Sequence, residues 1–521
     1  MDSYQKLIAH FKEYRLLESI GAIAGWDQHT YMPPKGANHR AAQMGYLAKL
    51  GHEKLTSPRI GELLGELAPP SPPAPLPQGE RGGSLPPHPQ PLSPGGEKGD
   101  EAVNVREIRR AYERAVKVPG TLVEEIAKTT SQAQNVWAEA RKQNDFPSFA
   151  PWLEKIVALK REEAAAVGYK DSPYDALLDE YEPGATAAEI TRVFAELRAD
   201  LVPLVGAIAE SGKRPRKDIL TREFAVDRQH IFGQAAAAAI GFDFQAGRLD
   251  TTVHPFCSGI GPGDCRLTTR YHPREFNQGF WGILHEAGHG IYEQGLDPEH
   301  FGTPCGSFAS LGIHESQSRL WENQVGRGRP FWEHFFPRLK QTFPGTLDDV
   351  TLDDFLFAAN KVEKSFIRVE ADEATYNMHI ILRFDMEQAL MTGDLKPSDV
   401  PGAWSERFKA MLDQTPPDDT QGCLQDIHWS MGGLGYFPTY TLGNLYAAQF
   451  IQQARKDLGD LDADFRIGRF ERLKGWLNEK VHRPGQRYRA GELCQRVTGS
   501  ALSHKPLIAY LRGKYEALYN I

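Results

Sequence analysis

A His-Glu-x-x-His pattern at residues 285–289 constrains this chain more than any other feature of its sequence. It lies within the stretch FWGILHEAGHGIY, whose apolar composition is typical of a buried helix. Because residues four apart share one face of a helix, His285 and His289 would present two imidazoles to one point. That arrangement suits a zinc ion, and Glu286 is placed to accept a proton from water. The pattern therefore favours a zinc hydrolase over two unrelated surface histidines.

A third metal ligand has to come from another segment of the chain. Glu293 lies on the same predicted helix, but the helix rises about 12 Å between His285 and Glu293, too far for convergence on one ion. Two carboxylates remain in the next apolar-periodic run, Glu315 and Glu322. Spacing alone favours Glu315, although either side chain could instead belong to a solvated helix face.

Three glycines interrupt the predicted metal-binding helix, at positions 282, 288 and 290. Each costs up to about 1 kcal/mol of helix stability relative to alanine. A helix tolerates them where packing offsets the loss, or where another backbone or a substrate must come close. The sequence alone does not distinguish these reasons. Gly295 is the expected end of the helix.

Length, charge and cysteine use limit the class of protein. A chain of 521 residues could hold up to about three domains, but helical enzymes of this size also form one body around a cleft. The formal net charge of −8 argues against nucleic acid as a partner. No apolar run approaches the roughly 20 residues that span a bilayer, and the opening segment has no signal-peptide core. The five cysteines form no Cys-x-x-Cys pair, which is typical of free thiols in a cytoplasmic protein.

The expected organisation is one domain over residues 1–521, interrupted by an insertion. Residues 1–67 have helical periodicity, with a turn expected at 26–34. Residues 68–100 are rich in Pro, Gly and Ser and contain the near-repeats PLPQGERGG and PLSPGGEKG, which predict a disordered insertion or, less favoured, a proline-rich ligand for a partner domain. The body, residues 101–521, is expected to be mainly helical, with a short antiparallel sheet at 241–271. Helices expected within it cover residues 107–137, 187–209, 228–240 and 355–390.

Several motifs together resemble those of the carboxypeptidase Taq family of zinc metallocarboxypeptidases. The resemblance covers nearly the whole chain apart from the insertion. HExxH alone is shared by many enzymes, whereas this set in this order is highly specific. The matching stretches are WDQxxxMP at 26–33, HPF at 254–256, DxRxT at 264–268, HExxH at 285–289, HESQ at 314–317, IRxxAD at 367–372, GxxQDxHW at 422–429 and GYFPTYTLG at 435–443.

The resemblance implies both a fold and an activity. The implied fold is a mainly α-helical, two-lobed body with a deep groove, similar to the neurolysin and angiotensin-converting-enzyme group. Glu315 is implied as the third zinc ligand, with one Zn²⁺ per chain and Co²⁺ able to substitute. The implied activity is the stepwise release of C-terminal amino acids from peptides, with broad specificity that usually excludes a terminal proline. Members of the family are typically cytosolic homodimers.

A peptidase also needs a donor for the oxyanion that forms at the scissile carbonyl. The segment 422–440 combines a high density of glycine with His, Trp and Tyr side chains, which is typical of a loop approached closely by a ligand. Tyr436 is the first candidate donor and His428 the second. Aromatic packing and turn structure are the alternative explanations for both residues.

An exopeptidase of this kind must bind a free carboxylate, and an arginine fork does so through two parallel hydrogen bonds. Arg368 is the first candidate and Arg266 the second. Either arginine could instead form a structural ion pair, Arg368 with Asp372 or Arg266 with Asp264. Two further functions stay open: an endo-acting oligopeptidase on the same zinc scaffold, and a helical binding protein without catalytic activity.

Overall fold

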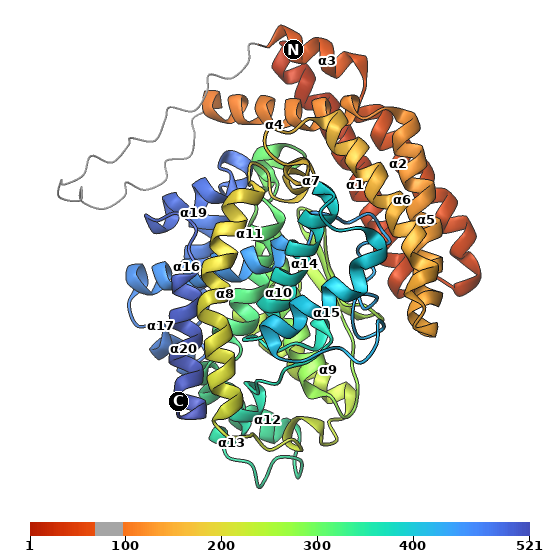
Figure 1. The fold of residues 1–521 in the computed structure, drawn as a ribbon. Helices are drawn as coiled ribbons and strands as arrows, with labels where there is room; N and C mark the ends of the chain where they lie inside the picture. The colour runs from red at the N-terminus through yellow and green to blue at the C-terminus, as the bar shows by residue number, and fades with distance from the viewer. Residues whose placement is uncertain (68–96) are drawn as a thin grey trace, which may run out of the picture.

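The computed structural model describes residues 1–67 and 97–521 (Figure 1). Most of the expected insertion at 68–100 lies outside the described residues, and its last four residues begin a helix. None of the described helices combines the length and apolar character needed to cross a membrane. The α-helices are α1 (Ser3–Thr30), α2 (Ala37–Leu55), α3 (Pro58–Glu66), α4 (Glu97–Lys117), α5 (Gly120–Gln143), α6 (Phe146–Val167), α7 (Pro173–Tyr181), α8 (Ala187–Glu210), α9 (Val226–Ile240), α10 (Phe276–Gly295), α11 (Leu311–Arg319), α12 (Arg329–Thr342), α13 (Leu352–Ala359), α14 (Tyr376–Thr392), α15 (Val400–Leu412), α16 (Pro438–Leu458), α17 (Leu461–Arg466), α18 (Glu471–Leu477), α19 (Ala490–Thr498) and α20 (Lys505–Tyr519).

Helices α1, α2, α5 and α6 lie together along one side of the body and are called the N-terminal layer (Figure 1). Asp2 caps the start of α1, since its carboxylate accepts a hydrogen bond from the Gln5 amide, and the helix runs without a break from Ser3 through Trp26 to Thr30. The turn expected at 26–34 is therefore wrong in extent, because the chain leaves the helix only at Tyr31. Helices α1, α3 and α4 share a small hydrophobic core, separate from the main one, formed by Leu7, Phe11, Ile60, Leu63, Leu64, Val105 and Ile108.

A small sheet lies between this layer and the metal-binding helix. Its strands are β1 (Gly247–Thr251), β2 (Cys257–Gly261) and β3 (Asp264–Thr269), in the order β1-β3-β2. Strand β3 pairs parallel with β1 and antiparallel with β2, so the expected antiparallel piece is a mixed sheet. The parallel pair arises because the chain crosses from β1 to the far edge before it returns through the centre as β3.

The long helix expected at 355–390 is wrong. Helix α13 ends at Ala359, and the chain runs irregularly, with one 3-10 turn at Arg368–Glu370, until α14 begins at Tyr376. The Asp372 carboxylate accepts hydrogen bonds from the amides of Glu363, Ala374 and Thr375, which fixes this loop just before α14 begins. The helix expected at 107–137 is likewise divided, at Val118-Pro119, into α4 and α5. Those expected at 187–209 and 228–240 are confirmed as α8 and α9.

A groove of about 810 Å³ lies between the N-terminal layer and the body. Residues of α1, α2 and α4–α7 line it, together with the segment 304–311 that leads into α11. Tyr181, at the end of α7, belongs to its wall. The groove therefore approaches the segment that precedes Glu315 in the chain.

Candidate metal centre

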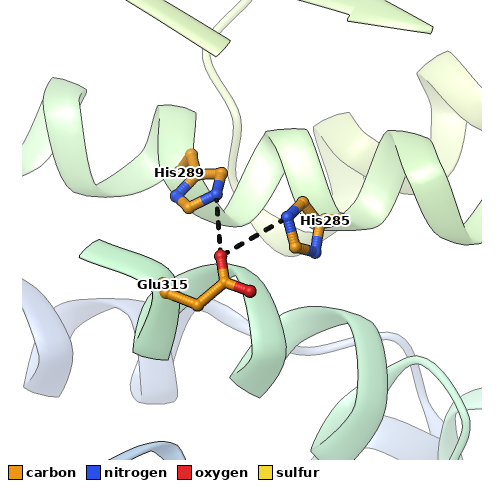
Figure 2. Close-up of side chains that lie close together, drawn as sticks. All are labelled: His285, His289 and Glu315. Carbon is orange, nitrogen blue, oxygen red and sulfur yellow. Dashed lines mark ion pairs between the residues drawn. The ribbon is translucent and has the colours of Figure 1, made fainter. Parts of the chain in front are cut away.

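Helix α10 carries His285 and His289 on the face that meets α11 (Figure 2). The expected buried helix is confirmed, since the apolar side chains around the histidines are almost fully enclosed. Its last helical residue is Gly295, as expected. The enclosed side chains are Phe280, Trp281, Ile283, Leu284, Ala287, Ile291 and Tyr292.

Two glycines let three helices approach one another at this point. A Cβ atom on Gly288 of α10 would lie 2.5 Å from the Gln317 carbonyl oxygen and 2.7 Å from the Ser318 Cα of α11. A Cβ atom on Gly443 of α16 would lie 2.5 Å from Cγ of Glu315. The absence of side chains at both positions allows the packing that sets Glu315 opposite the two histidines.

The three side chains converge on one point. Nε2 of His285 lies 3.6 Å from Oε2 of Glu315, and Nε2 of His289 lies 3.3 Å from the same oxygen (Figure 2). One ligand atom from each residue lies within 4.8 Å of the others, and among the described residues this is the group of three or more that could hold a metal ion. Two imidazole nitrogens and one carboxylate are the donor set of a catalytic site that keeps one position open.

The outer nitrogen of each histidine has its own partner. Nδ1 of His285 lies 2.9 Å from Oε2 of Glu322, the carboxylate that the sequence left as a competing ligand. Nδ1 of His289 lies 2.6 Å from Nδ1 of His314, whose Nε2 is 2.8 Å from Oε1 of Glu293. These contacts orient the rings so that both Nε2 atoms face Glu315.

The carboxyl groups of Glu315 and Glu286, beside the two histidines, have very different pKa values. Although burial alone would raise the pKa of Glu315, Arg319 and the two histidines hold it well below its usual value. Arg319 donates from Nε to Oε1 of Glu315 at 2.7 Å and from Nη1 to Glu322 at 3.2 Å. Burial raises the pKa of Glu286 to about 7, with the charges of Glu315 and Glu322 adding to the effect. Glu286 therefore takes up a proton far more readily than Glu315 does.

Comparison with known proteins agrees with this geometry. A family model described as carboxypeptidase Taq (M32) metallopeptidase matches residues 6–515. The chain belongs to this family. It is 49% identical over 526 residues to thermostable carboxypeptidase 1 of Thermus thermophilus, covering 99% of each chain. It is 37% identical to carboxypeptidase 1 of Bacillus subtilis, covering 99% of this chain and 97% of the relative.

The fold agrees with solved members of the carboxypeptidase Taq family. A crystal structure of an M32 carboxypeptidase from Deinococcus radiodurans R1 superposes with a TM-score of 0.92 at 40% identity, covering 100% of both chains. A carboxypeptidase of Pyrococcus furiosus superposes with a TM-score of 0.91 at 33% identity, covering 99% of both. The mainly helical fold is thereby confirmed. The likeness to the neurolysin and angiotensin-converting-enzyme group stays a prediction.

In this metallopeptidase, Tyr436 and His428 lie close together in the segment before α16. Their rings are 5.5 Å apart, and the Tyr436 ring is 5.2 Å from that of Tyr181 in the groove wall. Burial and the nearby charge of Glu315 raise the pKa of Tyr436. Burial, followed by the positive charges of nearby arginines, lowers the pKa of His428 to about 4, so its imidazole is neutral at pH 7.

Arg368 is buried beside His428 and Tyr440. Its Nε and Nη2 donate to Oδ1 of Asp426 at 3.0 and 2.8 Å, and its Nη1 donates to the Tyr376 hydroxyl at 3.0 Å. The ion-pair partner suggested from the sequence, Asp372, is therefore wrong, because Asp372 binds backbone amides instead. Arg383 donates to the other oxygen of Asp426 at 2.7 Å. Two guanidinium groups thus share one carboxylate and leave a buried excess of positive charge.

Arg266 occupies a different place. Its Nε and Nη2 donate to the two oxygens of Asp264 at 2.8 and 2.7 Å, and its guanidinium lies 4.2 Å from the centre of the Trp26 ring in α1. Side chains alternate along a strand, and the next residue, Leu267, faces α10 at Gly290. Arg266 therefore lies on the sheet face turned away from the metal-binding helix.

The sequence reasoning missed the roles of His314 and Glu293. The adjacent Glu315 was singled out, but nothing in the spacing shows that His314 would contact His289 from another helix. Glu293 gave a local signal, since it lies four residues after His289 and so on the same helix face. The distance along the helix excludes Glu293 as a ligand but leaves it free to contact a residue next to the ligands.

Proposed function

We propose that this chain is a zinc-dependent carboxypeptidase that releases C-terminal amino acids from peptides with broad specificity. The observation that carries the proposal is the convergence of His285, His289 and Glu315 within a chain of the carboxypeptidase Taq family. The buried excess of positive charge at Arg368 and Arg383 adds support, since it suits a substrate that ends in a free carboxylate.

The proposed ligands are His285 and His289 through Nε2 and Glu315 through its carboxylate; Co²⁺ is an alternative metal. When bound, zinc would act as a Lewis acid that polarises the scissile carbonyl and lowers the pKa of water. Glu286 accepts a proton from the attacking water and passes it to the leaving amine. The burial of Glu286 favours this role, because its raised pKa lets it hold the proton between the two steps.

The remaining roles belong to side chains across the site. The Tyr436 hydroxyl donates a hydrogen bond to the oxyanion, and the neutral imidazole of His428 is the second candidate for this role. Arg368 binds the terminal carboxylate with a guanidinium that Asp426 and Tyr376 hold in place.

A matched pair of peptides tests the proposal. The zinc-loaded protein is given one peptide as the free acid and as the C-terminal amide, and products are followed by mass spectrometry. We expect successive loss of single C-terminal residues from the free acid only, abolished by a chelator and restored by zinc. Cleavage of both peptides at internal bonds would instead identify an endo-acting oligopeptidase. No cleavage and no bound zinc would identify a binding protein.

We further propose that the protein is a cytoplasmic homodimer. Its five cysteines carry free thiols, which suits a reducing compartment. Leu16, Ile20 and Ile23 form an apolar stripe on α1 with 53%, 51% and 40% exposure, which suits contact with a second copy. Ile20→Glu should shift the sedimentation of a dimer towards that of a monomer. Val116→Glu, which changes an exposed valine of α4, should leave it unchanged.

A further inference from the structure

The main core contains a carboxylate that the proposed mechanism does not use. Glu387 of α14 has no exposed surface. Its Oε2 accepts hydrogen bonds from the Tyr174 hydroxyl at 2.6 Å and from the Gly435 amide at 3.0 Å. Its Oε1 accepts a hydrogen bond from Nε1 of Trp429 at 2.9 Å. A buried carboxylate is costly unless it is paired, and here three donors from two other parts of the chain satisfy it.

Two of these donors mark the ends of one turn. Trp429 directly follows His428 in the chain, and Gly435 directly precedes Tyr436. The residues between them form no helix or strand and include Gly432 and Gly433. The backbone hydrogen bonds of the turn, such as the one from the Gly433 amide to the His428 carbonyl at 2.8 Å, lie within the turn and do not attach it to the rest of the body. The contacts with Glu387 therefore hold the turn at the two places where the candidate oxyanion donors are attached.

Neighbouring elements restrict the same turn. Gly435 has a φ of +93°, and a Cβ atom there would lie 2.9 Å from the Leu177 carbonyl carbon of α7, so the turn cannot move towards that helix. Arg383, one helical turn before Glu387 on α14, binds Asp426 just ahead of His428. Helix α14 thus fixes the segment with one cation and one anion, while α7 closes the other side.

We propose that Glu387 is a positioning residue that sets the places of His428 and Tyr436 by holding both ends of the turn between them. This inference rests on the proposed function of that site. Loss of the carboxylate leaves the Gly435 amide and the Trp429 indole as buried donors without a partner, and the turn relaxes to satisfy them. A displacement of about 1 Å in a catalytic group costs on the order of 100-fold in rate.

Glu387→Gln tests the proposal, because an amide has one oxygen and cannot accept at both positions. We expect kcat on a free-acid peptide to fall about 10- to 100-fold, with KM changed less than about threefold and zinc content unchanged. Trp429→Phe, which removes one donor, should lower kcat less, and the two changes together should be less than additive. Tyr174→Phe is the matched control: it removes the donor outside the turn and should leave kcat within about twofold.

Hydrogen exchange gives a readout that does not depend on activity. Amides of residues 427–436 should exchange faster in Glu387→Gln and in Trp429→Phe than in the wild type, and at the wild-type rate in Tyr174→Phe. The inference would be overturned if Glu387→Gln had the kinetics and exchange rates of the wild type, or if Tyr174→Phe lost as much kcat as Glu387→Gln. Either result would leave the carboxypeptidase proposal unaffected. A wild-type protein that cleaves no peptide would overturn the proposed function, and exchange would still decide the role of Glu387. Trp429→Phe keeps the test open if Glu387→Gln does not fold.

Discussion

Glu322 lies 2.9 Å from Nδ1 of His285, on the opposite side of the ring from the nitrogen that faces Glu315. A carboxylate in this position accepts a hydrogen bond from Nδ1–H, which leaves the lone pair of Nε2 free to bind a metal. Arg319 donates hydrogen bonds to both Glu315 and Glu322. One cation therefore holds both the candidate metal ligand Glu315 and the carboxylate that orients the His285 ring. The two glutamates weighed as competing ligands therefore have different places around one histidine.

Glu322→Gln should weaken zinc binding about 10- to 100-fold, because a neutral amide orients and polarises the His285 ring less strongly. Competition with a fluorescent zinc chelator measures the dissociation constant. Glu406→Gln, a change at an exposed position of α15, is the control and should bind zinc like the wild type. An unaltered dissociation constant in Glu322→Gln would show that the contact has no influence on the metal.

Glu286→Gln should retain zinc and lose turnover, since the amide cannot accept the proton of the attacking water. General base catalysis contributes about 10²- to 10⁴-fold, so kcat should fall by at least about 100-fold. Zinc content by elemental analysis and peptide hydrolysis are measured on the same sample. Turnover near the wild-type value in the zinc-loaded variant would assign the proton transfer to another group.

The sequence predicted those parts of the site that depend on local periodicity. The apolar pattern around 280–292 was sufficient to place His285 and His289 on one helix face, and a second apolar run supplied two candidate carboxylates, Glu315 and Glu322, of which spacing favoured Glu315. Contacts between distant segments could not be read in this way: Arg368 pairs with Asp426, 58 positions along the chain. The helix expected at 355–390 is wrong because the Asp372 carboxylate binds backbone amides of a loop between two periodic stretches, which periodicity alone does not reveal.

Arg368→Lys should weaken the binding of free-acid peptides, because an ammonium group keeps the charge and loses the planar fork. We expect KM for the free acid to rise about 10- to 100-fold, while the amide, which the wild type does not cleave, stays uncleaved. Arg266→Lys is the matched control, since Arg266 is held by Asp264 under Trp26 on the far face of the sheet. The same KM for the free acid in all three proteins would remove Arg368 from carboxylate binding.

Close packing requires a glycine at position 288 of α10 but not at position 282. Gly288→Ala should lower the free energy of unfolding by about 1–3 kcal/mol and weaken zinc binding, because its Cβ would collide with the α11 backbone next to Glu315. Gly282→Ala meets its nearest atom, Oγ1 of Thr269, at an ordinary 3.8 Å and should stabilise the helix by up to about 1 kcal/mol. Urea denaturation of the metal-free variants measures both. Similar effects at the two positions would contradict the packing argument.

Glu182 should make the protein less stable as the pH rises through the slightly acidic range. Its buried carboxylate accepts the Gly312 amide at 2.9 Å, and burial raises its pKa from 4.5 to about 7. Between these values the folded chain holds a proton that the unfolded chain has released, so stability falls with rising pH by about 3 kcal/mol in total. Glu182→Gln keeps an acceptor for Gly312 and has no proton to lose. The difference in free energy of unfolding between this variant and the wild type should therefore grow in favour of the variant by about 3 kcal/mol between pH 4.5 and pH 8. Urea midpoints of the metal-free proteins measure it. Parallel pH profiles of the two proteins would show that Glu182 does not titrate in this range.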